Sequence, residues 1–486
     1  MWTTSSASST CPSSPTSPYL PLLKRAQCEY GDIVNAVRHK GLEPALLDLR
    51  DAGVYVSFEE FKGRKPIVRG DLVLEATPSD FDNPVLRRGF YTQTSGSTGR
   101  SIPSWVSLDY MENRMPSTVL NLASKGVLGA PTVIWRETMP GPGVILVLED
   151  VRAGQPYDHW FAPPLRRSVT TDVTSRVATE LVVLAARRSG ARVPRPQPLD
   201  YDRGVVVARW AERRIAGTGV CLVRAGISNS LRVATAAAEA GIDLSGATFV
   251  GAGEPASPAK ARVIESVGGN WMSGYAINEV GRVGTGCARP LDSTDVHFLK
   301  HASAIVPYPR EVPGTGQTVD AFNFTSILPG SPKVLLNAEL DDYGILETRS
   351  CGCLIEEAGL TEHIRQIFSF SKLTGEGVTL MGNDLLHVLE DVLPRRFGGS
   401  AVDYQLVEEE DAGGFTKLVL IVGPAVTFTD AKEVVDALLA GLGTSGLARD
   451  VRAIWQRAKS MEVRRGDPRV NLGGKVRPLL GRSVER

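Results

Sequence analysis

Cysteine is scarce in this chain, with six residues among 486. So few thiols in so long a sequence do not make a disulfide scaffold, which favours a reducing, cytoplasmic setting. An excess of charge is absent too, because 54 Lys and Arg residues balance 54 Asp and Glu residues. This balance argues against a protein that binds nucleic acid through its phosphates.

Long apolar runs are also missing. No stretch reaches the length of a membrane span, so we expect no transmembrane segment. Residues 1–18 are rich in Ser, Thr and Pro without the apolar core of a signal peptide, and they are predicted to be a disordered tail. The G-x-S-x-G elbow of serine hydrolases and the H-E-x-x-H motif of metalloproteases do not occur, which disfavours both classes.

Strands and helices are predicted to alternate through the middle of the chain. Apolar runs at 144–148, 220–223 and 247–250 have the length and composition of buried strands, and residues 228–240 have the apolar spacing of a helix. This alternation predicts an α/β fold with a mostly parallel sheet that helices cover on both faces.

The chain is predicted to divide into two domains after the tail. Residues 19–370 are expected to form a large, multi-layer N-terminal domain. The composition turns polar and glycine-rich near Ser371, and residues 371–486 are expected to form a small, mobile α+β domain. Within it, residues 384–393 are predicted to be a helix that Pro394 ends.

Hydroxyl side chains and glycines gather between residues 91 and 103. Glycines permit a tight turn in which amides and hydroxyls converge on an anion. A flexible Ser/Gly linker has the same composition and is the commoner explanation. The run is short, however, and ends in a basic residue and a proline, and no Walker pattern can be found in it. The candidate phosphate ligands are Thr94, Ser95, Gly96, Ser97, Thr98 and Gly99.

The order of residues 94–99 resembles the phosphate loop of the adenylate-forming superfamily, which includes the acyl- and aryl-CoA synthetases. Downstream, Gly253-Glu254-Pro255 is similar to the turn that contacts adenine in the phenylacetate–CoA ligase branch. Residues 251–256 also match the dinucleotide fingerprint G-x-G-x-x-[GA]. Pro255 interrupts that turn, and no acidic residue ends a second strand at the expected distance, which favours the adenine turn.

A further motif resembles the Tyr-Gly-x-Thr-Glu sequence of the superfamily. It runs from Tyr275 to Glu279, with Ala276 and Asn278 as departures. An aromatic face can stack on adenine, and a carboxylate can hold Mg²⁺ beside phosphates. Either residue alone would more often be a core tyrosine or a surface glutamate, but the spacing after Gly253-Glu254-Pro255 favours the nucleotide site.

Two more site residues are implied by the resemblance. Asp342 precedes a Gly-x-Leu segment, where the family places an aspartate on the ribose hydroxyls, and the adjacent Asp341 is the alternative. Lys475 follows two glycines and resembles the family lysine that bridges carboxylate and α-phosphate, although Arg477 stands one position early. A lysine in a glycine turn is otherwise usually solvated.

Four potential metal ligands occur in one region of the sequence. The turn Cys351-Gly-Cys353 allows both thiolates to point inward, and three thiolates with one imidazole form a closed, structural zinc site. A single cysteine is more often a small buried hydrophobe, and a single histidine more often a satisfied one. The phenylacetate–CoA ligase branch has a similar arrangement, which implies Zn²⁺ here. The ligands would be Cys287, His297, Cys351 and Cys353.

The resemblance extends from Tyr91 to Arg477 and implies that the chain uses ATP to activate an aryl or fatty carboxylic acid. Thr98, Glu279 and Lys475 would be catalytic, with Glu279 on Mg²⁺, and the acyl group of the adenylate would pass to coenzyme A. A carrier protein or an amine is an alternative acceptor.

A nucleotide-binding protein without turnover is a further alternative, because the family hinge Gly-Arg-x-Asp is absent. Lys372 and Glu376 are candidates to replace the hinge residue. The acid itself is not specified by the sequence, because large aromatic residues that can line an apolar pocket are more often core. The aromatic candidates are Trp135, Trp160, Phe161 and Trp271.

Overall fold

The structure is a computed structural model of the 486-residue chain. It describes residues 17–87, 89–93, 103–139, 141–163, 169–252, 256, 258–311, 318–369, 374–375, 378–379, 382–410, 416–441, 461–470, 476 and 478–480. Among the helices of these residues, none combines the length and the apolar character that crossing a lipid bilayer requires.

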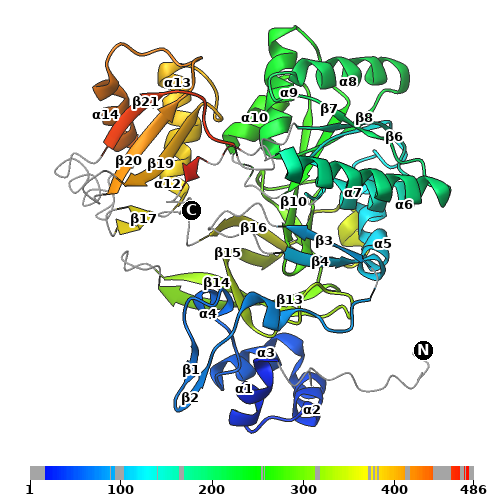
Figure 1. The fold of residues 1–486 in the computed structure, drawn as a ribbon, viewed down its shortest axis with the longest axis vertical. Helices are drawn as coiled ribbons and strands as arrows, with labels where there is room; N and C mark the ends of the chain where they lie inside the picture. Colours follow the sequence, from blue (N-terminus) through cyan, green and yellow to red (C-terminus); the bar gives the residue numbers. More distant parts are fainter. Residues whose placement is uncertain are drawn as a thin grey trace.

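A twelve-stranded sheet forms the centre of the large domain (Figure 1). Six of its strands pair in parallel, in the order β10-β9-β8-β5-β6-β7. The other six continue from β10 in antiparallel pairs, in the order β11-β12-β16-β15-β14-β13. The parallel strands are β5 (Thr132–Trp135), β6 (Tyr157–Ala162), β7 (Pro196–Pro198), β8 (Cys221–Ala225), β9 (Ala247–Ala252) and β10 (Asn270–Ile277). The antiparallel strands are β11 (Gly281–Gly286), β12 (Val296–Phe298), β13 (Ser303–Glu311), β14 (Thr318–Ser326), β15 (Ala338–Thr348) and β16 (Glu362–Ser369).

Helices cover both faces of the parallel strands, as the sequence predicts. Side chains alternate along each strand, so Val223 packs with one helical layer and Leu222 with the other. One layer consists of α8 (Gly204–Thr218), α9 (Ile227–Glu239) and α10 (Pro258–Ser266). The other consists of α5 (Leu108–Ser124), α6 (Gly143–Arg152) and α7 (Val169–Arg188). The predicted α/β architecture is therefore confirmed.

The apolar run 144–148 is a helix and not the predicted strand. It lies inside α6, where Val144 and Val147 are both 1% exposed and share one helical face. A short apolar run does not distinguish a buried helix from a buried strand by periodicity, and here the tertiary packing decides.

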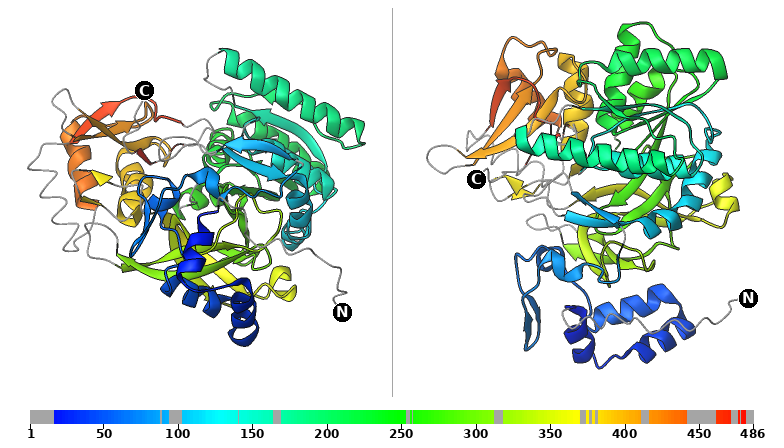
Figure 2. Two further views of the ribbon diagram at one scale, coloured as in Figure 1. Left: turned by 60° about the horizontal axis from the view of Figure 1, so that its bottom comes forward. Right: turned by 45° about the vertical axis from the view of Figure 1, so that its right-hand side comes forward.

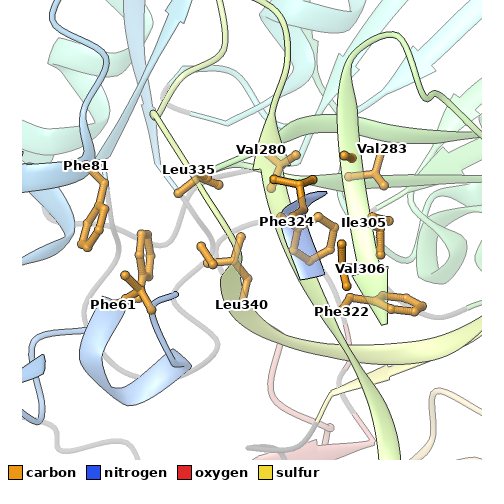
Figure 3. Packing of buried hydrophobic residues seen from close by; sticks show 14 of the residues in the cluster. Phe61, Phe81, Val280, Val283, Ile305, Val306, Phe322, Phe324, Leu335 and Leu340 are labelled. Atoms are coloured by element: carbon orange, nitrogen blue, oxygen red, sulfur yellow. The ribbon is translucent and has the colours of Figure 1, made fainter. Parts of the chain in front are cut away.

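The N-terminal segment packs against the antiparallel half of the sheet. Figure 3 shows Phe61 and Phe81 facing Leu335 and Leu340, with Phe324 and its neighbours further along the same core. Figures 1 and 2 place these first helices (blue) at the end of the molecule away from α8 and α9. The elements are α1 (Tyr19–Arg25), α2 (Tyr30–Lys40), α3 (Leu42–Asp51), α4 (Phe58–Phe61), β1 (Ile67–Arg69), β2 (Leu72–Leu74) and the 3-10 helix Pro78–Phe81.

Residues beyond 382 build a second, α+β unit with its own core, which the sequence predicted as a small domain. Its four-stranded sheet has the order β21-β20-β19-β22. The strands are β19 (Tyr404–Glu410), β20 (Thr416–Val422), β21 (Met461–Arg465) and β22 (Leu479–Leu480). The helices are α12 (Gly382–His387), a π-helical turn (Val388–Val392), α13 (Leu393–Phe397) and α14 (Ala431–Gly441).

Pro394 does not end the helical segment that begins near residue 384. It stands in the first turn of α13, where its missing N–H has no partner to lose, and the chain stays helical to Phe397. A π-helical turn separates α12 from α13 and accommodates this restart.

The two units meet where α10 contacts the π-helical turn. Lys260 Nζ lies 2.7 Å from Glu390 Oε1, and both side chains are only 2% exposed. Beside this pair, Arg262 Nη2 lies 3.0 Å from Asp391 Oδ1. A buried ion pair, with a partly exposed ion pair beside it, therefore joins the small domain to the large domain.

Candidate functional site

The hydroxyl-rich loop, Thr94 to Gly99, lies outside the described residues, but the two strands that flank it are described. Strands β3 (Gly89–Gln93) and β4 (Pro103–Ser107) pair antiparallel, with Gln93 opposite Pro103. The two ends of the loop are thus held side by side, which suits a hairpin loop better than a linker. Ser107 then starts α5, because its Oγ accepts hydrogen bonds from the Asp109 and Tyr110 amides.

The turn Gly253-Glu254-Pro255 also lies outside the described residues, between β9 and α10. At its start, a Cβ on Gly251 would come within 2.2 Å of the Ala225 carbonyl oxygen, so only glycine allows this close approach of β9 to β8. On its far side, the Ser293 hydroxyl donates to the Ala256 carbonyl at 2.5 Å. The turn therefore leaves the carboxyl end of a parallel strand, where ligands bind in open α/β sheets.

Tyr275 and Asp342, predicted separately from distant motifs, are brought together by the sheet. The Tyr275 hydroxyl donates to Asp342 Oδ2 at 2.8 Å, and this contact joins β10 to β15. Burial, and then the nearby Asp342 carboxylate, raise the pKa of Tyr275 well above its usual value. The ring is 8% exposed and belongs to the core, so its hydroxyl acts mainly as a fixed partner of Asp342. Asp342, rather than Asp341, makes this contact.

Glu279 lies in the turn between β10 and β11 and is 5% exposed. Its Oε1 lies 3.3 Å from Lys62 Nζ, which comes from the segment just after α4. Sequence reasoning missed Lys62, because no motif connects residues so far apart in the chain. A divalent ion bound to Glu279 would have to share this carboxylate with Lys62 or displace the Lys62 ammonium group from it.

The four predicted metal ligands lie close together beside β11 and β12. Imidazole Nε2 of His297 lies 3.1 Å from Cys353 Sγ and 3.6 Å from Cys351 Sγ. The His297 Nδ1–H donates to the Leu360 carbonyl at 2.7 Å, which leaves Nε2 as the ligand atom. Burial lowers the pKa of His297 to about 4, so the ring is neutral. Cys287, 2% exposed, joins the same cluster.

A fifth donor, His363, was not predicted. Cys287, His297, Cys351 and His363 each offer a ligand atom within 4.8 Å of the others. His363 pairs with His297 across strands β16 and β12, and its Nδ1 lies 2.7 Å from Asp295 Oδ1. Only the strand pairing brings this histidine to the cluster, so no sequence spacing signals it. Thiol sulfurs and imidazoles are the donor set that zinc prefers, and the residues present fit that ion.

The remaining predicted residues divide between core and undescribed chain. Trp135, Trp160, Phe161 and Trp271 are at most 8% exposed and pack in the cores on the two faces of the sheet. Lys475 lies outside the described residues, as do Lys372 and Glu376. Next to Lys475, Val476 is 3% exposed and bridges to Val470, which fixes the backbone beside the lysine.

Searches by sequence find no matching family model and no matching curated protein. The fold, by contrast, resembles that of solved structures. A 2-hydroxyisobutyryl-CoA ligase, solved in the postadenylation state with 2-HIB-AMP, matches 96% of this chain and 90% of its own, with a TM-score of 0.51 and 13% identity. An o-succinylbenzoate coenzyme A synthetase from Bacillus subtilis, solved with ATP and magnesium, matches 79% of this chain and 68% of its own, with a TM-score of 0.44 and 13% identity. The first likeness, at this identity, is one of fold.

Proposed function

We propose that this chain, which has the fold of an adenylate-forming CoA ligase, joins a carboxylic acid to the α-phosphate of ATP and releases pyrophosphate. The acyl group then passes from the adenylate to the thiol of coenzyme A, and AMP is released. The observation that carries the proposal is the shared fold, over 96% of the chain, with a CoA ligase bound to its acyl-adenylate. The order of the motifs from the loop at 94–99 to Lys475 supports it, and resembles the phenylacetate–CoA ligase branch.

In this proposal the hairpin loop between β3 and β4 holds the phosphates. The residues Thr94, Ser95, Gly96, Ser97, Thr98 and Gly99 provide its amides and hydroxyls. The turn Gly253-Glu254-Pro255 contacts adenine. Asp342, held by the Tyr275 hydroxyl, accepts hydrogen bonds from the ribose hydroxyls. Bound Mg²⁺ supplies positive charge beside the phosphates, and Glu279 is its protein ligand.

A structural metal ion completes the proposed assembly. Four donors, Cys287, His297, Cys351 and Cys353, would hold Zn²⁺, and His363, which lies in the same cluster, is the alternative to one of them. Such a closed site ties β11, β12 and the loop before α11 (Leu354–Glu357) together, and metal binding of this kind contributes directly to folding.

The proposal is tested by acid-dependent pyrophosphate release. Purified chain is incubated with Mg·ATP and a panel of aryl, aliphatic and dicarboxylic acids, with coenzyme A present or omitted. We expect release that requires an acid, and a thioester when coenzyme A is present. Release without thioester would assign the acceptor to a carrier protein or an amine. Nucleotide binding without release for any acid would contradict the proposal and favour a protein without turnover.

Glu279→Gln is expected to raise the Mg²⁺ concentration for half-maximal pyrophosphate release by roughly tenfold, because the ion loses a charged ligand. The measurement is a Mg²⁺ titration at saturating ATP and acid. Glu59→Gln serves as the matched control, since Glu59 lies on α4 in a partly exposed ion pair with Arg64. An unchanged Mg²⁺ titration in Glu279→Gln would show that Glu279 is not a ligand of the ion.

A further inference from the structure

Five ionised side chains lie together between helices α5 and α6 and the sheet. Two of them are acids on α6, and three are arginines on α5, β8 and β11. Each side chain is at most 11% exposed. The residues are Arg114, Glu149, Asp150, Arg224 and Arg282.

The contacts divide this cluster into two parts. Both oxygens of Asp150 accept from Arg224, whose Nη2 and Nε donate to them at 2.7 and 2.8 Å. Glu149 is shared, because Arg282 Nη2 lies 2.9 Å from its Oε2 and Arg114 Nη1 lies 3.1 Å from its Oε1. Among the described residues, three guanidinium groups therefore face two carboxylates, which leaves one positive charge in excess.

An excess buried charge is costly unless an anion balances it. The Thr118 hydroxyl accepts from Arg282 Nη1 at 2.6 Å, but a hydroxyl offers no charge. Arg114 Nε is buried and makes no hydrogen bond to any described residue. Burial, and then the neighbouring Arg114, lower the pKa of Arg282 to about 10. The described acids of the cluster therefore balance two of its three positive charges.

The cluster lies at the edge of the sheet that carries the candidate site. Arg282 pairs with Ala276 across the β10–β11 hairpin, and the same hairpin contains Tyr275 and Glu279. Arg224 stands near the carboxyl end of β8, the same edge that β9 leaves for the predicted adenine turn. The cluster and the candidate site therefore share the β10–β11 hairpin and the carboxyl edge of the parallel strands, where ligands bind in open α/β sheets.

We propose that Arg114 and Arg282 bind a second anionic group of the acid substrate, so that the acid is a dicarboxylate. This inference rests on the proposed function, because the first carboxylate is the one that attacks ATP. The reacting carboxylate is not the partner of the two arginines. Two charge-assisted contacts to the attacking carboxylate would stabilise it before the reaction and so raise the barrier to its attack on ATP.

The experiment compares dicarboxylic acids with monocarboxylic acids of the same skeleton, in the wild-type chain and in Arg282→Gln. We expect the wild type to prefer the dicarboxylic acids. In Arg282→Gln, kcat/KM for the dicarboxylic acid should fall by about 10- to 100-fold, the range for hydrogen bonds to a charged group. For the monocarboxylic acid, it should stay the same or rise. Arg152→Gln is the matched control, because Arg152 is an exposed arginine of α6 paired with Glu112.

A second readout does not depend on turnover. Arg282→Gln leaves two arginines facing two acids, so its thermal midpoint without ligand should equal or exceed that of the wild type. A dicarboxylic acid alone should raise the midpoint of the wild type and not that of the variant. Equal use of mono- and dicarboxylic acids, or an equal loss of both in Arg282→Gln, would overturn the inference while leaving the adenylation reaction intact. Where no acid supports pyrophosphate release, the proposed function fails, and the thermal shift alone decides whether the anion site exists.

Discussion

Lys475→Ala is expected to slow formation of the acyl-adenylate by about 10²- to 10³-fold, the loss that follows removal of one preorganised charge donor from a transition state. Negative charge accumulates on the α-phosphate as the carboxylate attacks, and the lysine would neutralise it at that moment. Because the interaction develops in the transition state, kcat should fall while KM for ATP changes little. Acid-dependent pyrophosphate release, followed at varied ATP, measures both.

The matched control is Lys432→Ala, which removes the same charge from an exposed position on α14 of the same domain. It should change the rate by no more than about twofold, as is usual for surface substitutions. Lys432→Ala should unfold at the temperature of the wild type, because its side chain is exposed, and we expect the same of Lys475→Ala. Equal rates of pyrophosphate release in Lys475→Ala and Lys432→Ala would contradict a catalytic role for Lys475.

Asp150→Ala is expected to lower the free energy of unfolding of the large domain by about 3–5 kcal/mol, the cost of breaking one side of a buried ion pair. The carboxylate has no exposed surface and accepts from both Arg224 and the Tyr157 hydroxyl. Its removal leaves three guanidinium groups facing Glu149 alone. Urea unfolding, followed by the fluorescence of the buried tryptophans of the large domain, measures the loss.

Two further variants separate charge from packing at this position. Glu112→Ala breaks an exposed ion pair with Arg152 and should cost less than about 1 kcal/mol. The double variant Asp150→Leu with Arg224→Met removes both charges and keeps apolar volume, so it should recover most of the stability that Asp150→Ala loses. If Asp150→Ala costs no more than Glu112→Ala, the cluster is not a buried charge network.

Local patterns predicted the architecture well where one periodicity dominated. The alternation of 220–223, 228–240 and 247–250 gave β8, α9 and β9, because each element is long enough to show its period. The run 144–148 is too short for that, and α6 forms there because its apolar face meets the sheet. Pro394 was predicted to end a helix, but it stands in the first turn of α13, because proline occurs both after helices and in their first turn.

The candidate site was predictable where its residues are close in sequence or share a motif. The pair Cys351 and Cys353 needs only one glycine between them, and Gly352 has the positive φ of +66° that such a turn requires. His363, Lys62 and Arg282 could not be predicted, because strand pairing or distant packing decides their partners. Their chemistry depends on the register of the sheet, which the sequence shows only indirectly.

The buried pair of Lys260 and Glu390 connects the small domain to the helix that follows the predicted nucleotide turn. Lys260 belongs to α10, the helix that follows Gly253-Glu254-Pro255, and Glu390 belongs to the π-helical turn. Any rotation of the small domain away from α10 must return both ions to water, where each regains its hydration. Linkage then requires reciprocity: a ligand that shifts the turn alters the preferred orientation of the small domain, and that orientation alters the affinity for the ligand by the same factor.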